Sequence, residues 1–313
     1  MFQLNSVREH HGLALLRSNW RQVLALLFLG FSAGLPLLLI FSTLSLWLRE
    51  AGLERGAVTY FSWAALGYSF KFVWAPLVDK LPLPLLTPLL GRRRGWLLFA
   101  QLAVMSAMVW MAMTDPQEGE LALTTMAMAA VMLGFSSATQ DIVIDAYRIE
   151  SAEEDLQALL SSTYVAGYRI GMVVAGAVAL YLASWFGSEI GAYDYAAWRS
   201  TYLCMAGAML VGVVTTLRMR EPQSSRVSSY LHRSRDYLRF LLLFLMVVAA
   251  FIATFAALAG NVTAAKQWLL ENWGFNSVLA AFLLESLRLL SALASALGMA
   301  YAAVLVGIAN RGM

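Results

Sequence analysis

Long apolar runs recur along the whole chain, and short polar stretches separate them. Eight runs are long enough to cross a lipid bilayer, which takes roughly 20 helical residues. They cover residues 23–47, 57–78, 96–113, 121–147, 161–186, 198–217, 240–259 and 278–308. Because lipid offers no hydrogen-bond partners, the backbone of each span must satisfy itself, which at this length means a helix. The pattern predicts an all-α fold, a polytopic bundle of membrane helices.

The composition agrees with a membrane protein. Hydrophobic residues make up 60% of the chain and charged residues 13%, whereas a soluble domain carries about 25% charged residues. A formal net charge of +3 is too small to indicate a nucleic-acid partner. The single cysteine, Cys204, lies in an apolar run and excludes both an intrachain disulfide and a multi-cysteine metal site. Nothing in the sequence indicates a metal ion or another cofactor.

The lysines and arginines between the spans predict the orientation. If the N-terminus lies in the cytoplasm, the alternate loops on that side contain most of the basic residues, including Arg92, Arg93 and Arg94. The other side then contains only Arg49, Arg55, Arg199 and Lys266. Cytoplasmic loops are the ones enriched in lysine and arginine, so we expect both termini in the cytoplasm.

The same pattern divides the chain into four parts. Residues 1–22 are a cytoplasmic N-terminus, and residues 23–217 contain six spans that form one domain. Residues 218–239 are polar, basic and serine-rich and contain Pro222, which is typical of a cytoplasmic linker. Residues 240–313 add two more spans, and we expect an amphipathic piece around residues 266–273 to rest at the outer membrane surface.

Several ionisable residues fall inside the predicted spans, where a charge is costly and marks a functional candidate. Lys71 lies in the second span, Asp141 and Asp145 near the end of the fourth, and Arg169 in the fifth. The two aspartates are four residues apart and therefore share a helix face. All four residues are expected in the cytoplasmic half of the membrane, where opposite charges at one depth favour a buried network.

Two interpretations of this network remain open. It is either a structural salt-bridge cluster that holds helices together, or a proton relay or substrate contact whose pairing changes during transport. For Asp141 and Arg169 we favour the functional interpretation, because buried charges are rarely kept for stability alone. Glu285 and Arg288 in the last span are three residues apart, and we expect them to neutralise each other.

Glycines at intervals of four mark the first and fifth spans. Gly30 and Gly34 precede Pro36 in the first span, and Gly167 and Gly171 lie in the fifth. Small residues at this spacing allow helices to approach closely, while proline bends a helix. Both features are common in transporters, although neither is specific.

Three strings together are more specific. The first, 31–36 (FSAGLP), is followed by 71–80 (KFVWAPLVDK) and 91–96 (GRRRGW). The second is 137–147 (SATQDIVIDAY), and the third is 167–172 (GYRIGM). In this order and spacing they resemble the AmpG-type muropeptide permeases of the major facilitator superfamily, from about residue 19 to about residue 222. The more distant acetyl-CoA transporter family is similar around Gln140 and Asp141.

The resemblance implies a proton-coupled permease of the bacterial inner membrane. Such permeases import N-acetylglucosamine–anhydro-N-acetylmuramyl peptides, which are muropeptides of cell-wall recycling. The residues at family-typical positions for the substrate or proton pathway are Lys71, Gln140, Asp141, Asp145, Tyr168 and Arg169.

The resemblance also implies a gating loop between the second and third helices, formed by Asp79 with Arg92 and Arg93. A proline-rich insert, residues 81–90, separates the aspartate from the arginines, as it does in AmpG-type permeases. A complete facilitator has a second six-helix half. The chain is therefore expected to be a fragment of a longer permease; the alternatives are a half-transporter that works as a dimer and a non-transporting relic.

Two alternatives come from other classes. One is a facilitator related to the acetyl-CoA transporters. The other is a polytopic membrane enzyme of lipid or wall precursors, in which Asp141 and Asp145 bind Mg²⁺ through carboxylate oxygens. The sequence offers no phosphate-binding glycine loop and no histidine cluster, so a transporter, and not an enzyme, is expected.

Overall fold

The chain folds into helices that form two compact units. The computed structural model describes residues 2–53, 64–152, 154–189, 191–222, 234–273 and 276–305. The first unit is Met1–Arg226 and the second is Val227–Met313. Within the described ranges, seven helical stretches are long and apolar enough to cross a membrane, and there is no strand beyond an isolated bridge between Glu189 and Ala192. The predicted all-helical membrane fold is confirmed.

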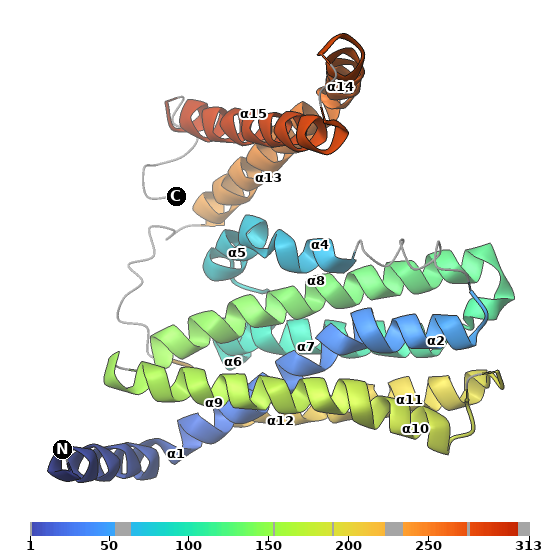
Figure 1. The fold of residues 1–313 in the computed structure, drawn as a ribbon. Coiled ribbons are helices and arrows are strands. Elements are labelled where there is room, and N and C mark those ends of the chain that lie inside the picture. Colours follow the sequence, from blue (N-terminus) through green and yellow to red (C-terminus); the bar gives the residue numbers. More distant parts are fainter. Residues whose placement is uncertain are drawn as a thin grey trace. The chain divides into compact units, whose positions relative to one another are not determined.

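The first unit contains most of the helices (Figure 1). Their bounds are α1 Phe2–Leu38, η1 Leu39–Thr43, α2 Leu44–Glu50, α4 Ala64–Ser69, α5 Lys71–Lys80, α6 Leu86–Leu90, α7 Arg92–Ala112, η2 Pro116–Glu118, α8 Glu120–Ser151, α9 Glu154–Val173, η3 Val174–Val178, α10 Ala179–Trp185, α11 Tyr195–Ala208 and α12 Leu210–Arg218. The segments η1 and η3 are single π-helical turns, and η2 is a 3₁₀ turn.

The helices of this unit lie side by side, and α1 packs along α9 (Figure 1). On other sides, α7 packs against α8 and α11, while α4 and α5 pack against α8. Two apolar clusters form the core. One contains Trp47, Trp198 and Tyr202, and the other contains Leu26 and Trp96. This packing places the polar residues of α8 among neighbours from α1, α4, α5 and α9.

Glycines bring α1 and α9 into direct backbone contact. A Cβ atom on Gly34 would stand 2.1 Å from the carbonyl oxygen of Tyr168, and one on Gly167 would stand 2.0 Å from that of Leu27. Such distances are closer than any side chain tolerates, so only glycine fits. The spacing of four residues in both helices therefore marks their contact face, as expected for small residues in membrane helices.

Beyond this contact, both helices contain a π-helical turn at the same level. The turns η1 and η3 lie side by side. A π turn disturbs the regular hydrogen-bond ladder, and hydroxyl groups bind two of the carbonyls concerned. Thr43 donates to the carbonyl of Ala175 at 2.7 Å, and Tyr202 donates to that of Leu39 at 2.9 Å.

The expected second span is only partly within the described residues. Residues 57–63 lie outside them, and the rest forms two short helices, α4 and α5, that are separated at Phe70. Lys71 is the first residue of α5, and Pro76 lies within it. The break places Lys71 at a helix start instead of in the middle of a continuous span.

The second unit consists of α13 Ser234–Ala257, α14 Ala259–Trp273 and α15 Ser277–Leu305. The predicted pair between Glu285 and Arg288 is confirmed, with Nη1 and Oε2 3.1 Å apart. Arg288 also donates through Nε to the carbonyl of Phe255 at 2.7 Å, near the end of α13. Arg288 therefore joins α15 to the last turn of α13.

The predicted linker, residues 218–239, contains the boundary between the two units. Residues 223–233 lie outside the described ranges, and α13 begins at Ser234, earlier than the expected span start at residue 240. The four proposed domain boundaries, and the surface position expected for residues 266–273, stay predictions.

Candidate functional site

One face of α8 carries a row of buried polar side chains. Ser137, Gln140 and Asp141 are all buried. Ser137 accepts a hydrogen bond from the hydroxyl of Tyr68 on α4 at 2.9 Å. Gln140 donates through Nε2 to the hydroxyl oxygen of Ser32 on α1 at 3.3 Å, while its buried Oε1 has no partner within the described part of the chain. The row thus faces the interior of the first unit.

Asp141 is the buried carboxyl of this row, with 8% of its surface exposed. The hydroxyl of Tyr164 on α9 donates to its Oδ1 at 3.5 Å, and the ring of Tyr168 lies 6.0 Å from that of Tyr164. Lys71 at the start of α5 interacts with Asp141 electrostatically without forming a direct ion pair. A buried carboxyl group with a hydroxyl donor and a cation in its surroundings is a candidate for a functional role in a membrane protein.

Asp145 and Arg169 are more accessible than Asp141. Asp145 has 48% of its side chain exposed and pairs with Arg148 at 3.3 Å, and Arg148 also donates to the hydroxyl of Ser161. Arg169 is exposed and forms no direct bond with Lys71 or Asp141 in the described part of the chain. The structure therefore brings Lys71, Gln140, Asp141 and Tyr168 into one region but leaves Arg169 on its surface.

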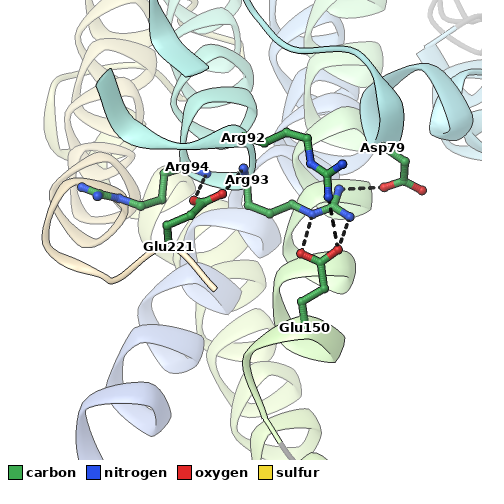
Figure 2. Close-up of polar contacts among 6 residues, drawn as sticks. All are labelled: Asp79, Arg92, Arg93, Arg94, Glu150 and Glu221. Carbon is green, nitrogen blue, oxygen red and sulfur yellow. Dashed lines mark hydrogen bonds and ion pairs between the residues drawn. The ribbon is translucent and has the colours of Figure 1, made fainter. Parts of the chain in front are cut away.

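A second group of charges lies where α5, α7 and α8 end or begin (Figure 2). The guanidinium of Arg93 donates through Nη1 to Asp79 at 2.7 Å and through Nε to Glu150 at 3.0 Å, and Nη2 also contacts Glu150. Arg92 lies near Glu150 too, with Nη2 and Oε1 3.6 Å apart. Arg93 is buried, so a single guanidinium holds the ends of three helices together.

The same end contains a carboxylate that caps α7. Glu221, which follows α12, accepts hydrogen bonds from the backbone amides of Arg93 at 2.8 Å and Arg94 at 3.0 Å (Figure 2). The orphan amides and positive dipole of a helix start favour a carboxylate there. Gly91 has φ +91°, and a Cβ on it would collide with Glu221. Arg94 donates to the carbonyls of Thr216 and Leu217 at the end of α12.

Two of these residues were missed by the sequence reasoning. Asp79, Arg92 and Arg93 were expected to form the gating loop, whereas Glu150 and Glu221 were not singled out. Glu150 follows the second resembling string by three residues, and Glu221 precedes Pro222 in the expected linker. Acidic residues at helix ends are common on any surface, so only their proximity to the 92–94 arginines in space distinguishes them.

The opposite end of the unit contains uncharged donors around two carboxylates. Glu50 accepts from the indole of Trp198 at 2.8 Å and from the hydroxyl of Ser188 at 2.7 Å. The hydroxyl of Tyr193 donates to Asp115 at 2.9 Å. Burial and this hydrogen bond raise the pKa of Tyr193 above its usual value. These contacts hold the ends of α2 and α11 and the intervening loops together.

A family model for the Major Facilitator Superfamily matches residues 23–312. The chain belongs to the major facilitator superfamily. The proteins of this family are transporters, so this facilitator is a multi-pass membrane protein of a small-molecule transport family.

Individual relatives agree with the resemblance to AmpG-type permeases. This facilitator is 37% identical over 198 residues to "Putative transporter AmpG 4" of Rickettsia felis, which covers 63% of the chain and 45% of the relative. It is 36% identical over 198 residues to the "Anhydromuropeptide permease" of Escherichia coli K12, which covers 63% of the chain and 37% of that protein. A Haemophilus influenzae protein of unassigned function is 34% identical over 204 residues, 65% of the chain and 44% of its own length. The chain matches less than half the length of each.

Proposed function

We propose that this facilitator chain contributes to proton-coupled import of anhydromuropeptides across the bacterial inner membrane and that it catalyses no chemical reaction. The proposal places both termini in the cytoplasm, with the Arg93 end of the first unit on the cytoplasmic side. It is supported by the printed name of the Escherichia coli relative and by the positive-inside distribution of arginines. A second transporter half, or a second chain, is the proposed partner.

The observation that carries the proposal is the environment of Asp141. Its carboxyl is buried among Tyr164, Tyr168 and the electrostatic field of Lys71. A buried carboxyl with a nearby cation exchanges a proton when the cation moves or when substrate replaces it. We therefore assign proton exchange to Asp141 and substrate contact to the polar groups around it, including Gln140, whose buried Oε1 is free to accept a hydrogen bond.

The gating role proposed for Asp79, Arg92 and Arg93 rests on a cluster that keeps this end of the first unit rigid. Arg93 joins Asp79 and Glu150, and Glu221 joins α7 to the end of α12. As long as these contacts are formed, α5, α7, α8 and α12 move as one body at this end. A transport cycle in which two halves rock against each other needs such rigid halves.

The test is uptake of a radiolabelled N-acetylglucosamine–anhydro-N-acetylmuramyl tripeptide into proteoliposomes. Two preparations are compared, one with the chain alone and one with the chain joined to the C-terminal half of the Escherichia coli permease. We expect uptake that rises when the outside is acidic and that collapses when a protonophore removes the pH gradient.

Other results would contradict the proposal. Competition by acetyl-CoA, without competition by unlabelled muropeptide, would favour the more distant transporter family. Metal-dependent turnover of a lipid or wall precursor by the purified protein, without uptake, would favour an enzyme. Uptake that is indifferent to the pH gradient would remove Asp141 from its assigned role.

A further inference from the structure

A groove of about 1460 Å³ runs between α1 and the last turns of α12. Pockets for small ligands in proteins usually measure about 300–1,000 Å³, so this groove is larger than most of them. It does not include Asp141, Lys71 or Gln140. The transport site proposed above therefore leaves it unexplained.

One end of the groove is lined with unpaired cations. Arg21 on α1, Arg218 at the end of α12 and Arg220 just after it are exposed and line the groove. None of the three forms an ion pair within the described ranges of the chain. Arg21 instead lies over the ring of Trp20, at 5.5 Å from its centre.

Two carboxylates also line the groove, but both are occupied elsewhere. Glu150 binds the guanidinium of Arg93, and Glu221 binds the backbone amides of Arg93 and Arg94. The charge of Glu150 is balanced by Arg93, whereas Glu221 keeps its negative charge at the start of α7. The three arginines of the groove therefore outnumber the one carboxylate that no cation balances, and this end carries a net positive charge.

The rest of the groove is apolar. Leu24 and Phe28 of α1 face it, as do Leu210 and Val214 of α12, and all four side chains are exposed. Trp20, with 54% of its surface exposed, lines the groove at the arginine end, beside Arg21. Tryptophan is enriched at the boundary where the hydrocarbon of a membrane meets its headgroups.

We propose that this groove binds one anionic phospholipid, with the phosphate among Arg21, Arg218 and Arg220 and an acyl chain along Leu24, Phe28, Leu210 and Val214. Arginine binds phosphate oxygens through paired N–H groups, and basic pockets between membrane helices bind anionic lipid headgroups. A soluble phosphate would use the cations but would leave the apolar track exposed. A zwitterionic lipid would fill the track but would bring no net charge to the three guanidiniums.

Thermal unfolding of the full 313-residue chain in a non-ionic detergent tests the proposal. Dioleoylphosphatidylglycerol, dioleoylphosphatidylcholine and inorganic phosphate are added separately at equal concentration. A ligand that binds only the folded state raises the unfolding midpoint. We expect phosphatidylglycerol to raise it by about 5 °C and the other two to raise it by less than half as much. Equal shifts with phosphatidylcholine or with phosphate alone would overturn the proposal.

Variants then assign the effect to the groove. Arg218→Gln combined with Arg220→Gln should abolish most of the shift that phosphatidylglycerol produces. The matched control is Arg49→Gln combined with Arg199→Gln, which removes two exposed arginines outside the groove and should keep the full shift. If both pairs lose the shift equally, general surface charge and not the groove is responsible.

A third variant tests the apolar track independently of charge. Val214→Trp fills part of the track and leaves all three arginines in place. It should reduce the shift with phosphatidylglycerol while keeping the midpoint without added lipid. A full shift in this variant would show that no acyl chain lies along α12, and the proposal would fail.

Discussion

The main chain of Gly34 lies directly against the carbonyl group of Tyr168, so that a Cβ on this glycine would stand 2.1 Å from the carbonyl oxygen. The atom it would meet belongs to the backbone of α9 and cannot rotate away. An alanine at this position must therefore push the two helices apart along their whole contact, including the nearby contacts of Gly30, Gly167 and Gly171.

Gly34→Ala is thus expected to destabilise the first unit by about 1–3 kcal/mol, the usual cost of an overpacked site. Thermal unfolding in detergent measures the change. Gly207→Ala is the control, because a Cβ there meets no atom within 4 Å and alanine is the better helix former. Equal midpoints for Gly34→Ala and Gly207→Ala would show that the α1–α9 contact is looser than described.

Arg93→Gln should destabilise the chain far more than Arg92→Gln. Arg93 has 5% of its side chain exposed and Glu150 has 14%, so removing the guanidinium leaves a poorly solvated carboxylate. Breaking a buried ion pair from one side costs about 3–5 kcal/mol. The unfolding midpoints of the two variants measure the difference.

The double variant Arg93→Gln with Glu150→Gln provides the control for this prediction. Removing both charges should restore part of the stability, because no poorly solvated carboxylate is then left unpaired; Asp79 also loses Arg93, but 46% of its side chain is exposed to solvent. If the double variant is no more stable than Arg93→Gln alone, the ion pair is not the source of the loss.

Asp141→Asn should abolish proton-coupled uptake while the protein still inserts into membranes. Asparagine keeps the shape and can accept the hydrogen bond of Tyr164, but it neither exchanges a proton nor balances Lys71. Uptake in proteoliposomes with an imposed pH gradient is the measurement.

Asp145→Asn is the matched variant one helical turn away. Its side chain is 48% exposed, so water can replace the lost ion pair with Arg148, and uptake should fall much less. The assignment of roles on α8 is wrong if Asp145→Asn is the more damaging substitution or if Asp141→Asn transports normally.

Cysteine labelling tests the orientation. After replacement of Cys204 by alanine, Leu89→Cys should react with a membrane-impermeant maleimide only when the cytoplasmic side is open, and Glu118→Cys should react in intact spheroplasts. Leu89 lies in the short helix α6 before α7, and Glu118 lies in the turn η2 before α8, at opposite ends of the first unit. Labelling of Leu89→Cys in intact spheroplasts would show that the orientation is opposite to the proposed one.

The sequence predicted the helical class well because length and apolarity alone decide it. The expected start and end of the first span, residues 23 and 47, lie within the apolar stretch Ser18–Glu50. The π turns were not predictable in the same way. Residues 39–43 contain neither glycine nor proline, and two of the carbonyls in the paired turns are bound by hydroxyls of Thr43 and Tyr202. Such partners become visible only when distant segments are brought together.

The candidate site, too, was predictable from the sequence only in part. Asp141 stood out because a carboxylate in an apolar span is conspicuous, and the structure buries it. Arg169 stood out for the same reason, yet its side chain is exposed, because an apolar span has faces that point away from its neighbours in the unit. Glu150 and Glu221 gave no signal, since their significance depends on which arginines approach them.

The paired π turns give the contact between α1 and α9 two different parts. In the glycine part, backbone meets backbone, and a Cβ atom on Gly34 or Gly167 would collide with the opposite main chain. In the part around η1 and η3, the amide of Leu44 still reaches the carbonyl of Leu39, and the hydroxyls of Tyr202 and Thr43 add bonds to the carbonyls of Leu39 and Ala175. The first part depends on the absence of side chains and the second on hydrogen bonds from side chains, so substitutions of the glycines and of the hydroxyl residues disturb the same pair of helices at different levels.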